Sequence, residues 1–327
     1  MITWTGLKRR ASRARLRIKV RNKSPLDKAI AWVKSHRLPG GGVRVHHRTD
    51  DVTQEVTGYL IPTLYHAGER ELALNLARWE SSVQRADGAF ACPTADIPYT
   101  FDTAQVIRGF LAVVDDLPEL ESPTRRACDY IERHIAPDGE ILHDSYETWR
   151  LPDGTSFSPY CNLYALPPLA EAGHRFSQTR YLDAVERSLN YFKRRPDLTT
   201  FKPELGSLSH IFGYIMEALV ELGEADLARR GLDQAAAVQR SDGAIPAYPG
   251  AHWVCSTGVA QVALAWWKSG EKEPATRALR YLETIQNPSG GFYGSYGADA
   301  QYMPNEEISW AAKYFIDLSL LIGGKHD

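Results

Sequence analysis

Two kinds of apolar pattern alternate along the chain after residue 23. In the first kind, apolar residues recur at helical spacing and charged residues occupy the opposite face, as in ERELALNLARWESSVQ at 69–84. This pattern predicts an amphipathic helix with one face in solvent. Six segments follow it, at 24–36, 69–84, 122–136, 178–195, 224–239 and 271–286. We expect them to be outer, half-exposed helices.

The second kind of segment is nearly uncharged. The six segments are TQEVTGYLIPTLYHAG, FDTAQVIRGFLAVVDD, PYCNLYALPPLAEAG, LSHIFGYIMEALVELG, CSTGVAQVALAWWKSG and NEEISWAAKYFIDLSLL. A helix that is apolar on most sides must be buried, so we expect these to be inner helices. The second segment stops at Pro118, and the others stop near glycines that suit a left-handed helix cap. Those glycines are Gly68, Gly173, Gly223, Gly270 and Gly323.

A short string recurs at the ends of outer segments. It reads QRADGAF at 84–90, QRSDGAI at 239–245 and QNPSGGF at 286–292. Its Asp-Gly and Ser-Gly pairs form turns, so each copy ends an outer helix and begins the loop into an inner one. Turn glycines recur at a period of about 50 residues, with a degenerate copy near Asp197, and such a period indicates a repeated unit.

Six helical hairpins with apolar inner members can bury those members only against one another. A closed ring achieves this without leaving an open edge. The sequence therefore predicts an all-α fold, an (α/α)6 toroid with a double ring of inner and outer helices. We expect one toroid domain at 24–323, preceded by a basic arm at 1–23.

The repeated strings resemble the QW-type repeats of the prenyltransferase and squalene-cyclase superfamily. The segments PYTFDTAQVIRGFLA, LSHIFGYIMEALVELG, WVCSTGVAQVALAW and SWAAKYFIDLSLL resemble more closely a group of bacterial toroid proteins with this repeat. That group is often associated with glycan biosynthesis. The resemblance covers nearly all of residues 40–322 and implies the toroid fold. It implies far less about chemistry, because one fold hosts many activities.

Charge is distributed unevenly between the arm and the rest of the chain. The formal net charge is -2, yet the first 26 residues contain basic residues and no acid. Such an arm is typical either of a solvated tail or of a segment that docks on anionic lipid headgroups or an acidic partner through residues 8–23. Nucleic-acid binding is disfavoured because the body of the chain is acidic.

Targeting signals and cysteine spacing point to a reducing compartment. The start of the chain lacks the apolar run of a secretory signal, and no stretch of about 20 apolar residues could span a bilayer. The four cysteines show neither a CxxC spacing nor an adjacent histidine. We therefore expect a cytoplasmic protein with no cofactor and no metal. Its basic arm offers a peripheral contact with an anionic membrane surface.

The loops between outer and inner segments are long and rich in aromatic residues, glycine and histidine, whereas the return connections are short. Function concentrates on long loops held by a rigid frame, so the site is predicted at the long-loop mouth. The candidate catalytic residues there are His210, Asp102, Tyr160, Tyr302 and Glu306. The candidate substrate-binding residues are Gln54, Glu55, Tyr99, Arg48, Asn162, Trp149, Trp253 and Asn305.

Purely structural interpretations exist for several of these residues. Asp102 could be a helix N-cap whose box is closed by Gln105, and Asn305 could be another N-cap. His210 could be a hydrogen-bonded core histidine. Caps do not account for a histidine, several tyrosines and at least two acids at one rim, whereas proton-transfer chemistry uses such a set.

Terpene chemistry is a natural suggestion from the repeat. DDLPE at 115–119 matches a DDxxE diphosphate motif, but it ends an inner helix at the short-loop mouth and contains Pro118, which breaks a helix. A zinc-dependent prenyltransferase-like site would need a partner for Cys255. A terpene cyclase or prenyltransferase-like enzyme therefore remains a minor alternative.

Carbohydrate chemistry fits the expected mouth better, since it offers flat aromatics for sugar faces and arginines for a uronate. We expect a lipid-linked or polymeric glycan as substrate. The favoured reaction is uronosyl epimerisation or elimination, with His210 as base and Tyr160 or Tyr302 as acid. One alternative is glycoside hydrolysis by Asp102 with Glu306 or Glu55. Another is a toroid that binds a glycan without changing it.

Overall fold

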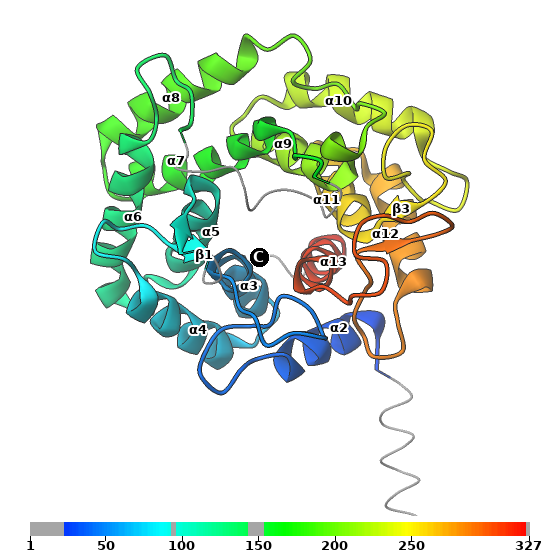
Figure 1. The fold of residues 1–327 in the computed structure, drawn as a ribbon, viewed down its shortest axis with the longest axis horizontal. Helices are drawn as coiled ribbons and strands as arrows, with labels where there is room; N and C mark the ends of the chain where they lie inside the picture. Colours follow the sequence, from blue (N-terminus) through cyan, green and yellow to red (C-terminus); the bar gives the residue numbers. More distant parts are fainter. Residues whose placement is uncertain (1–22, 93–95, 143–153, 325–327) are drawn as a thin grey trace, which may run out of the picture.

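The computed structural model describes residues 23–92, 96–142 and 154–324. Over these residues the chain forms a closed double ring of helices, with inner and outer members in strict alternation (Figure 1). The expected (α/α)6 toroid is confirmed. The arm at 1–22 and Trp149 lie outside the described residues.

The outer ring follows the amphipathic segments closely. Its helices are α2 (Pro25–Ser35), α4 (Arg70–Val83), α6 (Glu121–Arg133), α8 (Thr179–Lys193), α10 (Ala225–Val238) and α12 (Lys272–Ile285). The start of α2 shows why the boundaries were predictable. Ser24 accepts a hydrogen bond from the backbone of Asp27, whose side chain accepts one in return, and Pro25 occupies the first helical position.

The inner ring is buried almost throughout. Its helices are α3 (Gln54–His66), α5 (Thr100–Val113), α7 (Leu166–Arg175), α9 (Ser209–Glu221), α11 (Ser256–Lys268) and α13 (Ser309–Ile322). In α9 every residue from Ser209 to Leu219 is buried. Such a helix owes its stability to packing against its neighbours rather than to its own propensity.

The third inner segment differs from the expected continuous helix. It begins as a 3₁₀-helix, η2 (Pro159–Ala165), and becomes α-helical only at Leu166. Pro167 and Pro168 explain the change, because neither has an N–H to donate to the preceding turn and each proline ring clashes with the carbonyl four residues earlier.

The helix caps are partly as expected. Gly68, Gly223 and Gly270 take the left-handed conformation after α3, α9 and α11. Gly173, however, lies inside α7, and the left-handed residue after that helix is Ser177. After α13 it is Gly324 and not Gly323. Gly173 instead provides room for packing, since a Cβ there would lie 2.6 Å from the Leu182 side chain.

The repeated strings form the joints between hairpins. The amide nitrogen of Gln84 donates to the carbonyl of Gly88 in its own turn, at 3.0 Å, and to that of Pro123 on α6, at 2.8 Å. Gly88 has a φ of +94° and touches the next outer helix, where an added Cβ would lie 2.2 Å from the Arg126 carbonyl oxygen. The string therefore specifies a turn and its attachment to the following hairpin.

The other two strings make the same joint. Gln239 donates to Gly243 at 3.1 Å and to Pro274 at 3.0 Å. Gln286 donates to Gly290 at 3.0 Å and to Pro25 at 2.9 Å. This last joint links the sixth hairpin to the first and closes the ring. At the degenerate copy, the bridging amide comes from the next outer helix, where Gln234 bonds to Thr199 and Phe201.

All long connections reach one mouth of the ring and all short ones reach the other. At the long-loop mouth the loops carry short antiparallel pairs. These pairs are β1 (Ala91–Cys92) with β2 (Ile97–Pro98), and β3 (Val254–Cys255) with β4 (Ser295–Tyr296). The 3₁₀ turn η3 (Leu205–Ser207) lies in the long connection before α9, and η1 (Pro118–Leu120) lies in the short connection between α5 and α6. Among the described residues, none of the helices has the length and apolar character needed to cross a bilayer.

Candidate active site

The inner helices α3 and α5 are in backbone contact. A Cβ on Gly58 would lie 2.8 Å from the backbone of Val106, and one on Gly109 would lie 2.5 Å from the Gly58 carbonyl oxygen. Only glycine allows so close an approach. The contact brings together the first turns of the two helices, which carry Glu55 and Asp102 at the long-loop end.

Glu55 and Asp102 form a pair of interacting carboxyls, in which Asp102 is buried and Glu55 is half-buried. Burial raises the pKa of Glu55 to about 7, although a Tyr214 hydrogen bond and the charge of Lys313 act in the opposite direction. Burial, with a further contribution from Glu55, raises the pKa of Asp102 well above its usual range. Two such groups cannot both ionise freely. Each carboxyl therefore keeps its proton to a higher pH than it would in water.

The two carboxyls have few partners. The hydroxyl of Tyr214 donates to Glu55 over 3.5 Å, which is a weak hydrogen bond. Oδ1 of Asp102 has no hydrogen-bond partner among the described residues, and only 4% of the residue is exposed. A buried polar atom without a partner is costly, and such atoms are typical of sites that await a ligand or perform chemistry.

His210 is held as a neutral imidazole. Burial lowers its pKa to about 4. Its Nδ1 lies 2.5 Å from Oε1 of Gln261, and the amide nitrogen of Gln261 points the other way, to Glu217 at 3.4 Å. Because an amide oxygen only accepts, Nδ1 carries the hydrogen and Nε2 keeps its lone pair.

Aromatic rings surround His210. The imidazole centroid lies 4.6 Å from the Tyr214 ring and 5.9 Å from the Tyr302 ring. Tyr302 in turn meets Phe157 edge to face, with centroids 6.4 Å apart. The charge of Glu55 reaches Tyr302, whose pKa is raised mainly by burial. Two carboxyls, an imidazole and phenols are therefore linked by contacts and charge effects at this end of the ring.

Four tyrosines fill the middle of the ring beneath this region. They are Tyr59, Tyr164, Tyr214 and Tyr314, and we call them the tyrosine layer. Tyr214 lies 4.9 Å from Tyr164 and 6.2 Å from Tyr314 between ring centroids, and Tyr59 lies 6.1 Å from Tyr314. Each is at most 2% exposed. The layer separates the two ends of the ring interior.

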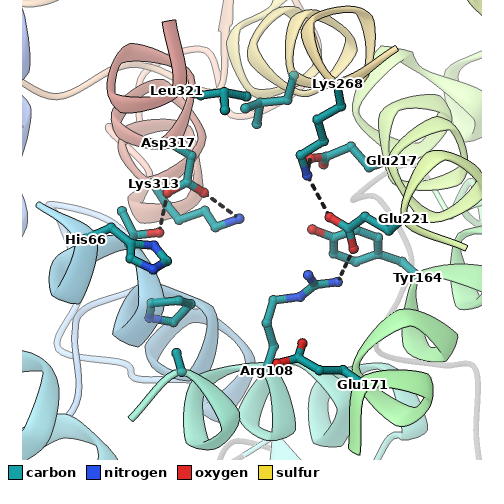
Figure 2. Close-up of a pocket in the computed structure, with 14 residues that line it drawn as sticks. His66, Arg108, Tyr164, Glu171, Glu217, Glu221, Lys268, Lys313, Asp317 and Leu321 are labelled. Atoms are coloured by element: carbon teal, nitrogen blue, oxygen red, sulfur yellow. Dashed lines mark hydrogen bonds and ion pairs between the residues drawn. The ribbon is translucent and has the colours of Figure 1, made fainter. Parts of the chain in front are cut away.

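A cavity of about 420 Å³ lies on the other side of the tyrosine layer, at the short-loop mouth (Figure 2). Its walls are the later turns of the inner helices, and they carry opposite charges in contact. Arg108 and Lys268 both reach Glu221, at 2.9 and 2.7 Å. Lys313 bonds to Asp317 at 3.0 Å. This charged cavity is not the mouth at which the sequence predicted the site.

The structure gathers part of the predicted catalytic set. Asp102 and His210 lie at the same end of the ring, with Tyr302 beside His210 and Glu55 beside Asp102. Tyr160 instead bonds to Asp197 at 2.9 Å, with Lys202 over its ring. We therefore do not include it in the central group.

Glu306 also lies outside the central group. It is partly exposed and forms an ion pair with Arg48 at 3.5 Å, so these two predicted residues meet each other at the surface. Asn305 is exposed beside them. The neighbouring Glu307 is buried and accepts a hydrogen bond from the Trp32 indole at 2.7 Å. Its role is to attach the last loop to α2.

The remaining predicted binding residues are mostly buried. Gln54, Tyr99 and Asn162 lie at the starts of inner helical segments, with exposed fractions of 8%, 3% and 7%. Trp253 is 2% exposed and meets Tyr248 edge to face, so its indole packs in the core and presents no open face to a sugar.

The structural interpretations can now be compared with the observed caps. Asp102 is not an N-cap, because Tyr99 occupies that position of α5. Asn305 is not an N-cap either, because Ile308 precedes α13. At the short-loop end the two aspartates of DDLPE form ion pairs, Asp115 with Arg175 and Asp116 with Arg70. Across the described residues, no cluster of three or more His, Cys, Asp or Glu could hold a metal ion.

Two residues at this site were missed from the sequence. Tyr214 lies four positions after His210, so both occupy the same face of α9, and this spacing was visible. Gln261 gave no such signal, because it meets His210 only through the packing of α9 against α11. Gly213 explains that packing, since a Cβ there would lie 2.6 Å from the Gln261 side chain.

Comparisons with known proteins agree with the fold. A scan of protein-family models and a search of curated protein sequences gave no match. Among solved structures, an alpha-amylase from Clostridium perfringens superposes with a TM-score of 0.69 at 14% identity, over 93% of this chain and 98% of that chain.

Two other solved structures are similar over comparable lengths. An unsaturated glucuronyl hydrolase specific for heparin gives a TM-score of 0.67 at 14% identity, over 92% of this chain and 96% of that one. A polysaccharide lyase gives 0.61 at 12% identity, over 92% and 96%. At these identities the likeness shows the (α/α)6 toroid. The prenyltransferase-type repeat stays a prediction.

Proposed function

We propose that this protein is a carbohydrate-active enzyme that hydrolyses glycosidic bonds at the long-loop end of the ring. The observation that carries this proposal is the pair of Glu55 and Asp102, two interacting carboxyls whose pKa values are both raised. Glycoside hydrolysis needs one carboxylic acid that is protonated at working pH and one carboxylate that is not. The pair supplies both in one site.

The two carboxyls take different roles. Asp102 holds its proton more strongly and acts as the general acid that protonates the leaving oxygen. Glu55, with a pKa of about 7, acts as the base or nucleophile on the opposite side of the bond. Tyr214 donates to Glu55 and so favours its ionised form.

The substrate class is proposed on two grounds. Phe157, which is half-buried against Tyr302, brings aromatic surface to the same end of the ring as the carboxyls. The similar solved structures include an alpha-amylase, a glucuronyl hydrolase and a polysaccharide lyase, which are named for reactions on glycans. Both grounds favour a glycan. A terpene diphosphate is disfavoured for a separate reason, because the aspartates of DDLPE are already paired with arginines.

The test is an assay of new reducing ends on a panel of neutral and uronate-containing oligosaccharides. The wild type should release reducing ends from at least one of them. Asp102→Asn and Glu55→Gln should each lose activity while keeping the wild-type circular dichroism spectrum and melting temperature. Activity that survives both substitutions would refute the carboxyl-pair mechanism.

A second candidate reaction is proton abstraction at carbon 5 of a uronate, leading to epimerisation or elimination. The neutral His210, with its Nε2 lone pair available, favours this reaction. Tyr302 beside it would supply the acid. Deuterium incorporation from solvent, or unsaturated products without new reducing ends, would select this reaction over hydrolysis.

A further inference from the structure

The cavity at the short-loop mouth does not end at the ring axis. A second hollow of about 1070 Å³ shares Arg108, Glu171 and Glu221 with it and continues outward beside α7 and α8. Together they form one elongated hollow, which we call the lower groove. The tyrosine layer separates the lower groove from the carboxyl pair, so it is not a continuation of the candidate active site.

The lysines and arginines of the lower groove are already paired with carboxylates. Arg108 and Lys268 share Glu221, and Lys313 pairs with Asp317. Arg108 and Lys268 hold the pKa of Glu221 at about 2, against the effect of burial. An ionic ligand would have to displace one member of a partly buried pair, which is costly. This arrangement favours a neutral ligand.

Hydrogen-bonding capacity remains on one ammonium group and on one carboxyl group of the lower groove. Lys313 donates to Asp317 alone among the described residues, and its ammonium group projects into the cavity (Figure 2). Within the same part of the chain, the carboxyl of Glu171, which is exposed to the solvent of the groove, has neither a hydrogen bond nor an ion pair. A ligand that satisfies both must donate and accept, as a hydroxyl group does.

The groove also presents apolar surface between these polar groups. Pro62, Ala112, Leu264 and Leu321 line the cavity, and Leu182 and Leu189 line its outward extension. Water could satisfy the polar atoms but would gain nothing from this surface. A sugar chain combines hydroxyl edges with C–H faces and is long enough in shape to follow the groove.

We propose that the lower groove is a binding site for a neutral oligosaccharide, separate from the carboxyl pair. The proposal stands independently of which reaction occurs beyond the tyrosine layer. The groove nevertheless touches the candidate active site through one link, since Glu217 on its wall bonds to the amide of Gln261 that orients His210.

The first test measures binding at Lys268, a residue of the groove that does not belong to the carboxyl pair. Lys268 lies in the groove with 32% of its side chain exposed, and Lys34 on α2 serves as a reference at 46%. Both are acetylated by an amine-specific reagent and quantified by mass spectrometry. Maltotriose is the neutral probe, hexamethonium the cation and tri-galacturonate the anion.

Maltotriose at ten times its dissociation constant should slow acetylation of Lys268 about tenfold, as expected when the bound form is protected. The reference lysine should react at an unchanged rate. The proposal is wrong if maltotriose gives no protection at any soluble concentration, or if only hexamethonium or tri-galacturonate protects Lys268.

The second test fills the groove. Ala112→Trp places a large side chain in the cavity, and Val83→Trp adds the same side chain at an exposed position of α4 as the matched control. Ala112→Trp should weaken maltotriose binding by about tenfold or more, while Val83→Trp leaves it unchanged. If Ala112→Trp does not fold, Leu321→Trp at the end of α13 tests the same point. Unchanged affinity in a folded filling variant would overturn the proposal.

Discussion

The Nδ1 nitrogen of His210 lies 2.5 Å from Oε1 of Gln261, so an amide on α11 fixes the tautomer of an imidazole on α9. The first prediction concerns this contact. Gln261→Glu places a carboxyl in the same position, and an ionised carboxyl favours the imidazolium. The pKa of His210 should therefore rise from about 4 to a value near or above the usual 6.5. Nuclear magnetic resonance titration of the His210 ring measures it.

Glu217→Gln provides the matched control for this measurement. It changes the other partner of Gln261 and leaves the contact with His210 in place. The pKa of His210 should then stay near 4. A histidine that titrates near 4 in Gln261→Glu as well would show that this amide does not set its protonation.

The second prediction is a bell-shaped pH profile for the hydrolysis. Activity should rise as pH increases through about 7, because Glu55 must lose its proton, and fall at higher pH as Asp102 loses its own. Glu55→Gln and Asp102→Asn should each reduce kcat by roughly 10²–10⁴-fold. Initial rates of reducing-end release across pH give both results.

Asp116→Asn is the control for the carboxyl substitutions. Asp116 lies at the short-loop end, where it bonds to Arg70 and Tyr65. This variant should keep the wild-type profile. A comparable loss of activity in Asp116→Asn would contradict the assignment of catalysis to the carboxyl pair and would point to DDLPE at the opposite mouth.

The third prediction concerns Glu80, a fully buried carboxyl on α4. Both of its oxygens lack a hydrogen-bond partner among the described residues, and burial raises its pKa well above the usual value. A raised folded-state pKa means that stability is fully present below the unfolded pKa and is lost as pH rises towards the folded one. Glu80→Met should therefore stabilise the protein by about 1–3 kcal/mol at pH 8 and by less at pH 5.

Urea unfolding at several pH values tests this prediction. Glu71→Met changes an exposed carboxyl on the same helix and should shift stability little at any pH. The account of Glu80 is wrong if Glu80→Met destabilises the protein at pH 8, or if its effect does not depend on pH.

The fourth prediction concerns the glutamine joints. Gln286→Ala removes the hydrogen bonds to Gly290 and Pro25 and should lower the free energy of unfolding by about 1–3 kcal/mol. Gln178→Ala is the control, because among the described residues that side chain bonds to Phe176, within its own connection. The free energy of unfolding of Gln178→Ala should fall by less than about 0.5 kcal/mol. If both variants lose the same free energy of unfolding, the glutamine joints do not stabilise the ring more than an ordinary loop hydrogen bond does.

The ring could be predicted from the sequence because its information is local and repeated. Apolar spacing defined the outer helices, and caps such as Ser24 with Pro25 defined their starts. The 3₁₀ start of the third inner segment was missed, although Pro167 and Pro168 were visible, because their effect falls on the preceding turn.

The candidate site was predictable only in part. Asp102 and His210 were placed at one rim because each begins an inner helix that follows a long loop. Glu306 was also assigned there, but its surface pair with Arg48 could not be read from spacing. The contact between His210 and Gln261 depends on how the neighbouring inner helices α9 and α11 pack side by side, which sequence periodicity does not encode.

The joint between Gln286 and Pro25 has a consequence for how such a protein can vary. In an open array of repeats, units can be added or lost at the ends, and each end needs a polar cap. Here the sixth hairpin contacts the first, so the array has no ends. The contact uses the same glutamine hydrogen bond that connects internal neighbours. An added or deleted hairpin would leave unmatched surfaces on both sides of the change. Diversification is therefore confined to the length and composition of the loops at one mouth, while the number of units stays fixed.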